Sequence, residues 1–191
     1  MVVLTSELTT DLADVPVSAA QLQRRLSVAV TSHHQLVWRT LRRCGVPERD
    51  VDDAAQQVFL AFSQRLLEVA AGKEAAYLAA IVVRVAANAR RKLDRSPEVL
   101  SEDVAAAAAS TTPESLLGQK QLRQELDRGL LTLPIEQRAV FVLFELEGFS
   151  LPEIAEALQI PLGTATSRLR RARGHFEAWV AGRGADTGDD P

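Results

Sequence analysis

The fold is decided by residues 133–180, which read LPIEQRAVFVLFELEGFSLPEIAEALQIPLGTATSRLRRARGHFEAWV. This stretch predicts a helix, a tight turn and a second helix, and Ser150 and Glu153 have capping-box spacing at the start of the first. The second helix, from Pro161, carries four arginines and no acidic residue as far as His175. A short helix pair whose second helix is loaded with arginine is typical of proteins that read duplex DNA.

The helix predicted from Pro161 has two distinct faces. Its apolar residues recur at helical spacing and form one stripe toward the core: Ala165, Leu169, Ala172, Phe176 and Trp179. The remaining polar residues are the candidate contacts to DNA: Thr164, Thr166, Ser167, Arg168, Arg170, Arg171 and Arg173. Arginine can bond guanine bidentately, and Ser or Thr can reach phosphates. A solvated basic face is the alternative, but the capped helix and turn that precede it favour DNA contact.

Outside this stretch, the apolar pattern predicts an all-α chain of two small helical domains joined by a flexible linker. The first domain is expected at residues 18–95, with helices at 19–44, 48–67 and 73–94. The linker is expected at 96–113, which opens and closes at prolines and has no amphipathic period. A helix through its alanine run is the alternative.

The second domain is expected at residues 114–180 and contains the helix-turn-helix. Its predicted helices are 114–131, 135–146, 151–158 and 161–180. Residues 181–191 are rich in Gly and Asp and are expected to be a disordered tail.

Composition excludes several classes of protein. The chain is 47% hydrophobic and has a single cysteine, Cys44, which suits a helical core and excludes an internal disulfide framework. Its start resembles no signal peptide, and no apolar run is long enough to cross a membrane, so we expect a cytoplasmic protein without membrane insertion. The net charge of −3 argues against a protein that coats DNA.

A second basic surface is predicted on the helix near residue 90. Four residues at spacings of four, three and four line one exposed stripe: Arg84, Asn88, Arg91 and Arg95. Arginines can hold phosphates while an amide reads a base edge, so the stripe suits a nucleic-acid strand. Taken alone, it could equally be a solvated helix face.

The helix near residue 55 differs from these two because its polar residues are acids and amides. The candidate contacts are Asp52, Asp53, Gln56 and Gln57. Such a face suits a protein partner better than a nucleic acid, although ordinary exposed polar residues would look the same.

The pattern of reactive residues indicates no enzyme and no cofactor. His33 and His34 are adjacent, so they point apart on a helix, and neither has acid or thiol partners at metal-ligand spacing. We therefore expect no catalytic residues and no metal site.

Three segments together resemble the RNA polymerase sigma factors of the extracytoplasmic-function (ECF) type, a class within the sigma-70 family. The segment DVDDAAQQVFLAF (50–62) resembles the family's polymerase-clamp helix, and RVAANARRKL (84–93) resembles the segment that meets the minus-ten promoter element. Residues 133–173 resemble the reader of the minus-thirty-five element nearly end to end.

This resemblance implies a partner for each surface. The face with Asp52, Asp53, Gln56 and Gln57 would dock on the clamp coiled coil in the largest subunit of the bacterial RNA polymerase core. The stripe from Arg84 to Arg95 would meet the minus-ten region of promoter DNA, and the helix from Pro161 would read the minus-thirty-five duplex. An anti-sigma factor is a further partner that the family often has.

Two other functions are consistent with parts of the sequence. One is a stand-alone helix-turn-helix regulator that binds a palindromic site as a dimer without polymerase. The other is a helical interaction protein that has kept the sigma shape without opening promoters. The acidic-amide face and the second basic stripe favour the sigma factor, because a stand-alone regulator needs neither.

Overall fold

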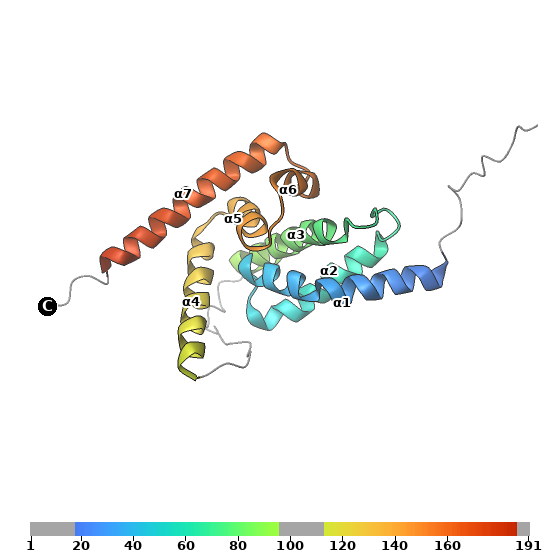
Figure 1. Cartoon of the computed structure of the whole chain (residues 1–191), viewed down its shortest axis with the longest axis horizontal. Coiled ribbons are helices and arrows are strands. Elements are labelled where there is room, and N and C mark those ends of the chain that lie inside the picture. The colour runs from blue at the N-terminus through green and yellow to red at the C-terminus, as the bar shows by residue number, and fades with distance from the viewer. Residues whose placement is uncertain (1–17, 96–112, 187–191) are drawn as a thin grey trace, which may run out of the picture.

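The computed structural model describes residues 18–95 and 113–186, and within those ranges the secondary structure is entirely helical (Figure 1). The predicted all-α class is therefore confirmed. The elements are α1 (Ala19–Arg43), α2 (Glu48–Gln64), α3 (Glu74–Arg95), α4 (Pro113–Thr132), α5 (Ile135–Phe141), the π-helical turn η1 (Val142–Leu146), α6 (Leu151–Leu158) and α7 (Leu162–Asp186). No helix in the described ranges combines the length and the apolar character that crossing a bilayer requires.

Helices α1 to α3 pack around one core. At the start of α1, the Ser18 side chain accepts a hydrogen bond from the Gln21 backbone, and the Gln21 side chain accepts one from the Ser18 backbone. This capping box satisfies two donors that the first turn leaves without helical partners. The largest fully buried apolar side chains of this core are Val37, Leu41, Val51, Val58, Phe62, Leu78 and Val82.

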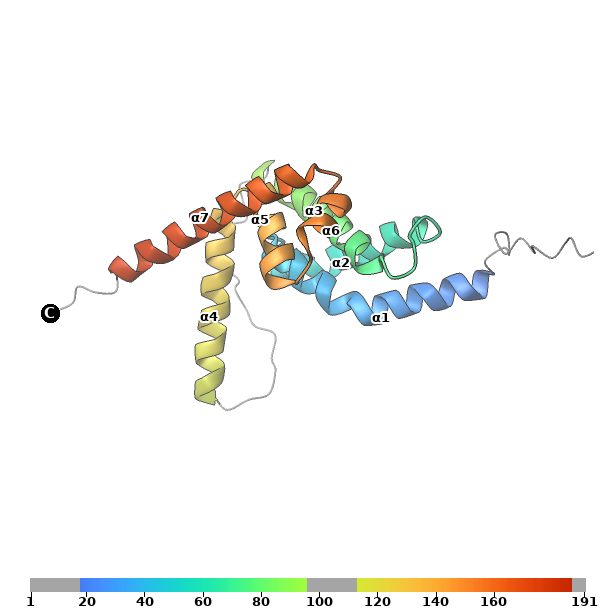
Figure 2. The same cartoon turned by 45° about the horizontal axis from the view of Figure 1, so that its top comes forward.

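Helices α4 to α7 and η1 surround a second core. Its most buried members are Leu130, Leu133, Val140, Val142, Leu143, Ile154 and Ala172. The C-terminal end of α4 lies against the middle of α7, and the two helices then diverge (Figures 1 and 2). Gly129 allows this crossing, because a Cβ there would lie 2.7 Å from a ring atom of Phe176 and 2.7 Å from one of Trp179.

The turn between α6 and α7 has the geometry of a helix-turn-helix. The Ser150 hydroxyl accepts a hydrogen bond from the Glu153 backbone, so α6 begins at the predicted capping box. At its end, Gln159 adopts a left-handed conformation with φ of 54°, and the Ile160 backbone N–H donates to the carbonyl of Ala155 at 3.0 Å. This stop reverses the chain within a few residues, so that α7 crosses α6 directly.

The two cores meet at α3. Ala79 of α3 is 2% exposed and belongs to the second core, while Ile135 of α5 packs against the first. Further contacts join α3 to α6 and α1 to α4. The two halves of the chain therefore pack directly on each other.

Several predicted boundaries differ from those observed. Helix α7 continues to Asp186, so residues 181–186, which were predicted to be a disordered tail, are helical. The predicted helix at 135–146 changes into a π-helical turn after Phe141. Residues 96–112 of the predicted linker lie outside the described residues, and the predicted domain boundaries stay predictions.

Candidate nucleic-acid interface

Helix α7 presents one face to the second core and the other to solvent. Ala165 and Ala172 are completely buried, and Leu169 is 4% exposed, as the apolar stripe predicts. On the outer side, four of the seven predicted DNA-contacting residues are exposed: Thr166, Arg170, Arg171 and Arg173. The other three, Thr164, Ser167 and Arg168, are half-buried.

Two hydroxyl groups on α7 are held by hydrogen bonds within the helix. The hydroxyl of Thr166 donates to the carbonyl of Leu162 at 2.9 Å, and that of Ser167 donates to the carbonyl of Thr164 at 3.0 Å. Both hydroxyls keep lone pairs that can accept further hydrogen bonds, but their protons are already used.

The arginines of α7 differ in whether they have an acidic partner. The guanidinium of Arg173 donates to Glu145 at 2.6 Å and lies 5.4 Å from the ring centroid of Phe144, so it is drawn toward η1. Within the described part of the chain, neither Arg170 nor Arg171 forms an ion pair. These two exposed cations are therefore the ones that an approaching phosphate or base edge would meet first.

Helix α3 carries the second predicted basic stripe. Arg84, Asn88 and Arg91 are exposed, and Arg91 donates to the side-chain oxygen of Asn88 at 3.0 Å. This hydrogen bond leaves the amide NH₂ of Asn88 available as a donor. The predicted fourth member, Arg95, ends α3, and its side chain lies outside the described residues.

The predicted acidic-amide face lies on α2. Asp52, Asp53, Gln56 and Gln57 are all exposed, and Asp52 accepts a hydrogen bond from the indole N–H of Trp38 at 3.2 Å. Leu60, which the sequence pattern did not single out, is 62% exposed on the same helix. Its signal was its spacing, because Leu60 follows Gln56 and Gln57 by one helical turn.

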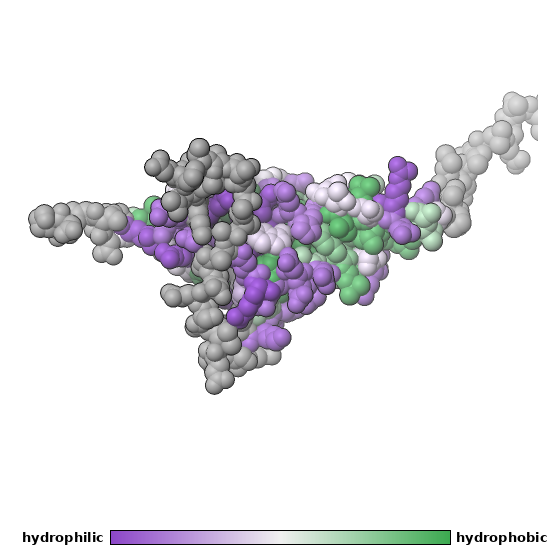
Figure 3. Space-filling view, turned by 90° about the horizontal axis from the view of Figure 1, so that it is seen from below, coloured by the Kyte–Doolittle hydropathy of each residue, from purple (hydrophilic) through white to green (hydrophobic). Residues whose placement is uncertain are grey.

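Apolar surface continues beyond α2. A shallow groove of about 250 Å³ between α1 and the end of α2 is lined by Leu22, Leu26 and Leu67, among others. The view from below shows apolar surface gathered on this half of the molecule (Figure 3). The face of α2 therefore combines charges, amides and apolar groups, which is a composition suited to a protein partner.

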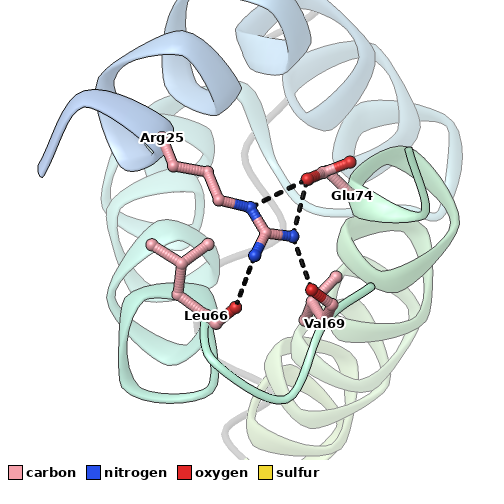
Figure 4. Close-up of polar contacts among 4 residues, drawn as sticks. All are labelled: Arg25, Leu66, Val69 and Glu74. Atoms are coloured by element: carbon pink, nitrogen blue, oxygen red, sulfur yellow. Dashed lines mark hydrogen bonds and ion pairs between the residues drawn. The ribbon is translucent and has the colours of Figure 1, made fainter. Parts of the chain in front are cut away.

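The loop that joins α2 to α3 is fixed by an arginine that the sequence analysis did not single out. The Arg25 guanidinium donates to the carbonyl oxygens of Leu66 and Val69 and to the carboxylate of Glu74 (Figure 4). Burial would raise the pKa of the Glu74 carboxyl, but hydrogen bonds from Arg25 and the backbone outweigh it and hold that pKa below its usual value. A single arginine of α1 thus holds both the loop and the start of α3.

A cleft of about 450 Å³ lies between α3 and the helices α5 to α7. Arg84 of α3 and Arg168 of α7 both line it, although the sequence analysis assigned them to two separate DNA surfaces. Lys73 lies 3.6 Å from Glu156 across the same cleft. Periodicity could not predict that Arg84 and Arg168 line the same cleft, because this depends on how the two halves of the chain pack.

The described residues contain no cluster of His, Cys, Asp and Glu that could hold a metal.

Comparison with protein families gives two matches in this chain. Residues 29–96 match the model of sigma-70 region 2, and residues 123–176 match that of sigma-70 region 4. The first range contains the candidate surfaces on α2 and α3, and the second contains α6 and the outer face of α7.

Curated relatives agree with these matches. The ECF RNA polymerase sigma-E factor of Escherichia coli K12 is 36% identical over 141 residues, which cover 67% of this chain and 72% of that protein. The ECF RNA polymerase sigma factor SigE of Mycolicibacterium smegmatis is 29% identical over 160 residues, which cover 83% of this chain. The matched part spans 62% of the length of the M. smegmatis protein.

Two solved structures have similar folds. CnrH in complex with the cytosolic domain of CnrY matches with a TM-score of 0.59 and 26% identity, over 86% of this chain and 95% of that one. The sigma factor RpoE of Bartonella quintana, in complex with the anti-sigma factor NepR, matches with a TM-score of 0.64 and 20% identity. That match covers 85% of this chain and 98% of that one, and it supports the fold alone.

Proposed function

The chain belongs to the ECF sigma factors of the sigma-70 family, and on that premise we propose that it directs a bacterial RNA polymerase core to specific promoters and starts transcription there. The observation that carries this proposal is the outer face of α7, where Arg170 and Arg171 are exposed beside a capped helix-turn-helix. Members of this family are transcription initiation factors without catalytic activity, and no reaction of the chain's own is proposed.

Helix α7 reads the minus-thirty-five duplex in this proposal. Its exposed residues Thr166, Arg170 and Arg171 enter the major groove, where arginine can bond guanine bidentately. Arg168 and Arg173 flank them and contact phosphates, and Arg173 must first leave Glu145. Thr164 and Ser167 are half-buried and contribute oxygen acceptors or backbone contacts at the edge of the groove.

Helix α3 meets the minus-ten element. Arg84, Arg91 and Arg95 hold the phosphates, and the amide of Asn88 reads a base edge of the strand that is opened.

Helix α2 docks the protein on polymerase. Its carboxylates and amides, at Asp52, Asp53, Gln56 and Gln57, contact the clamp coiled coil of the largest subunit. Leu60 supports this proposal, because an exposed leucine one turn beyond polar contacts can fill an apolar pocket in the partner. The cytoplasm is then the proposed location, since it is where core polymerase works. An anti-sigma factor is a further proposed partner, as seen with the Bartonella protein.

Run-off transcription tests the proposal directly. Purified core polymerase would be incubated with and without this protein on sheared DNA from the source genome. Discrete new transcripts are expected, and their start sites would identify both promoter elements. Asp53→Ala combined with Gln56→Ala should abolish the transcripts by weakening core binding, which a pull-down with core polymerase measures separately.

Two outcomes would contradict the proposal in different places. If the α2 double variant transcribes as well as the wild type, the proposed contact of α2 with the polymerase clamp is wrong, but the proposed promoter function stands. Sequence-specific DNA binding without any affinity for core polymerase would indicate a stand-alone regulator instead.

A further inference from the structure

One residue of the α2 face, Asp52, is held by a side chain of α1. The indole N–H of Trp38 donates a hydrogen bond to Oδ1 of Asp52 at 3.2 Å. Of the four polar residues assigned to this face, Asp52 alone has a side-chain partner within the part of the chain that the structure describes. A hydrogen bond to an ionised acceptor is stronger than one between neutral groups, so it favours a single orientation of the carboxylate.

Trp38 is itself held on two sides. Its ring is half-buried and packs against the first core. Arg42, one helical turn later, lies over the ring with its guanidinium carbon 5.8 Å from the centroid. Arg42 in turn pairs with Glu48 at the start of α2 at 2.9 Å. The indole therefore cannot turn away from α2 without losing these contacts, and its N–H stays directed at Asp52.

A second contact extends the same boundary between α1 and α2. His34, one turn before Trp38, stacks on Phe59 of α2, with ring centroids 6.4 Å apart and planes 5° from parallel. Phe59 follows Asp52 by two helical turns, so both lie on the same side of α2. Side chains of α1 therefore line one edge of the α2 face over two turns, and that face is built by two helices.

A carboxylate held in this way is suited to a cationic partner. The bond from Trp38 uses one oxygen of Asp52 and leaves the other free to accept from an arginine or lysine of another protein. Because the side chain of Asp52 is already ordered, binding loses less conformational freedom than it would with a rotating carboxylate.

We propose that Trp38 is a positioning residue of the polymerase-binding surface, which holds Asp52 in the orientation in which it meets a basic side chain of the polymerase. This role rests on the proposed sigma-factor function, whereas the contact between Trp38 and Asp52 does not. The surface that binds polymerase then includes α1 as well as α2.

Trp38→Phe tests this role in the full chain, because it keeps an aromatic ring against the core and removes the N–H donor. The chain has one other tryptophan, Trp179, which packs on Phe176 of α7 and lies outside the α2 face. Trp179→Phe is therefore the matched control. Affinity for purified core polymerase would be measured by biolayer interferometry. Trp38→Phe should weaken it about three- to tenfold, mainly through faster dissociation, and the control should bind like the wild type.

A double-mutant cycle separates positioning from a structural role. If Trp38 acts through Asp52, Trp38→Phe should have no further effect on core binding once Asp52 has been replaced by alanine. A role in stability alone would weaken core binding equally in both backgrounds. In the Trp179→Phe protein, Trp38 is the sole tryptophan, so its fluorescence reports on the contact without polymerase. Asp52→Ala should shift that emission in the free protein.

Core binding by Trp38→Phe as tight as that of the wild type would overturn the proposal, as would an equal loss in the Asp52→Ala background. Circular dichroism shows whether Trp38→Phe is folded. If it is not, Asp52→Glu gives a second measurement, because it keeps the charge but moves the carboxylate away from the indole. Asp52→Glu should also weaken core binding, and wild-type affinity of this variant would count against positioning.

The two levels of the proposal can fail separately. A wild-type protein without affinity for core polymerase would remove the proposed function and, with it, the role of Trp38 in binding. A shift of the Trp38 emission on Asp52→Ala would still establish the contact between the two helices. Core binding that is normal in Trp38→Phe would leave the proposed function and remove only the positioning role.

Discussion

Replacing Gly129 by alanine tests how closely α4 packs on α7. The new Cβ would lie 2.7 Å from ring atoms of both Phe176 and Trp179, closer than such atoms pack. The rings cannot simply retreat, because their centroids are 5.7 Å apart and Phe176 also packs on Phe141 at 5.2 Å. Relief must therefore come from separation of the two helices.

The size of the effect follows from two opposing contributions. Changing Gly to Ala inside a helix ordinarily stabilises a protein by about 0.5–1 kcal/mol, because alanine has less backbone freedom to lose on folding. Overpacking a well-filled contact costs about 1–3 kcal/mol. Gly129→Ala should therefore lower the free energy of unfolding by about 0–2.5 kcal/mol. Gly174→Ala on α7, where nothing lies within 4 Å of the new Cβ, should raise it by about 0.5–1 kcal/mol.

Urea unfolding of the full chain, followed by circular dichroism, measures both variants against the wild type. The difference between the variants isolates the steric cost, since the helix-propensity gain is common to both. Equal effects of the two substitutions would refute the tight crossing of α4 and α7.

Three further predictions concern single side chains. Arg171→Ala should weaken binding to the minus-thirty-five duplex about 10- to 100-fold, as measured by fluorescence anisotropy, and leave core-polymerase binding unchanged; a loss of core binding instead would contradict the role of α7. Because Arg25 holds the pKa of Glu74 below its ordinary value of 4.5, the stability that Glu74 contributes is present above that value and is lost as the pH falls through the lower folded pKa. Glu74→Gln should therefore flatten the acid side of a thermal-stability series against pH, and an unchanged acid side would count against the Arg25 contact. Burial raises the pKa of the Cys44 thiol to about 12, so a thiol reagent at pH 8 should react with it only after unfolding, and rapid reaction of the native protein would contradict its burial.

The local structure could be predicted where both ends of an element carry a signal. Helix α6 was predicted at residues 151–158 and lies at Leu151–Leu158, because Ser150 and Glu153 cap its start and the turn at Gln159 ends it. The end of α7 could not be predicted in this way. Its Gly- and Asp-rich residues have low helix propensity, yet they continue a helix whose preceding turns pack on α4.

The candidate surfaces could be predicted as faces of single helices, because exposure follows from helical spacing. The contacts between the two halves of the chain could not be predicted from the sequence. Glu147 reads as an ordinary acid at the end of a helix, and only the fold brings Arg39 and Arg43 to it. The burial of Arg138 had a weak signal in the sequence, since Arg138 lies four residues before the buried Val142 and so on the inward face of the helix.

The winding of η1 has a consequence for the ion pairs that join the residue after it to α1. Its five residues make a wider turn than an α-helix, with the Glu147 backbone N–H donating to the carbonyl of Val142 at 3.1 Å. Each residue of an α-helix rotates the chain by about 100°, so deleting one residue from Val142–Leu146 would turn Glu147 away from α1 by about that angle. Glu147, Arg39 and Arg43 would all still be present, but the carboxylate would be out of phase with its two arginine partners. The ion pairs between the two halves of the chain thus depend on helical phase as much as on charge, and an insertion or deletion of one residue in η1 should break them.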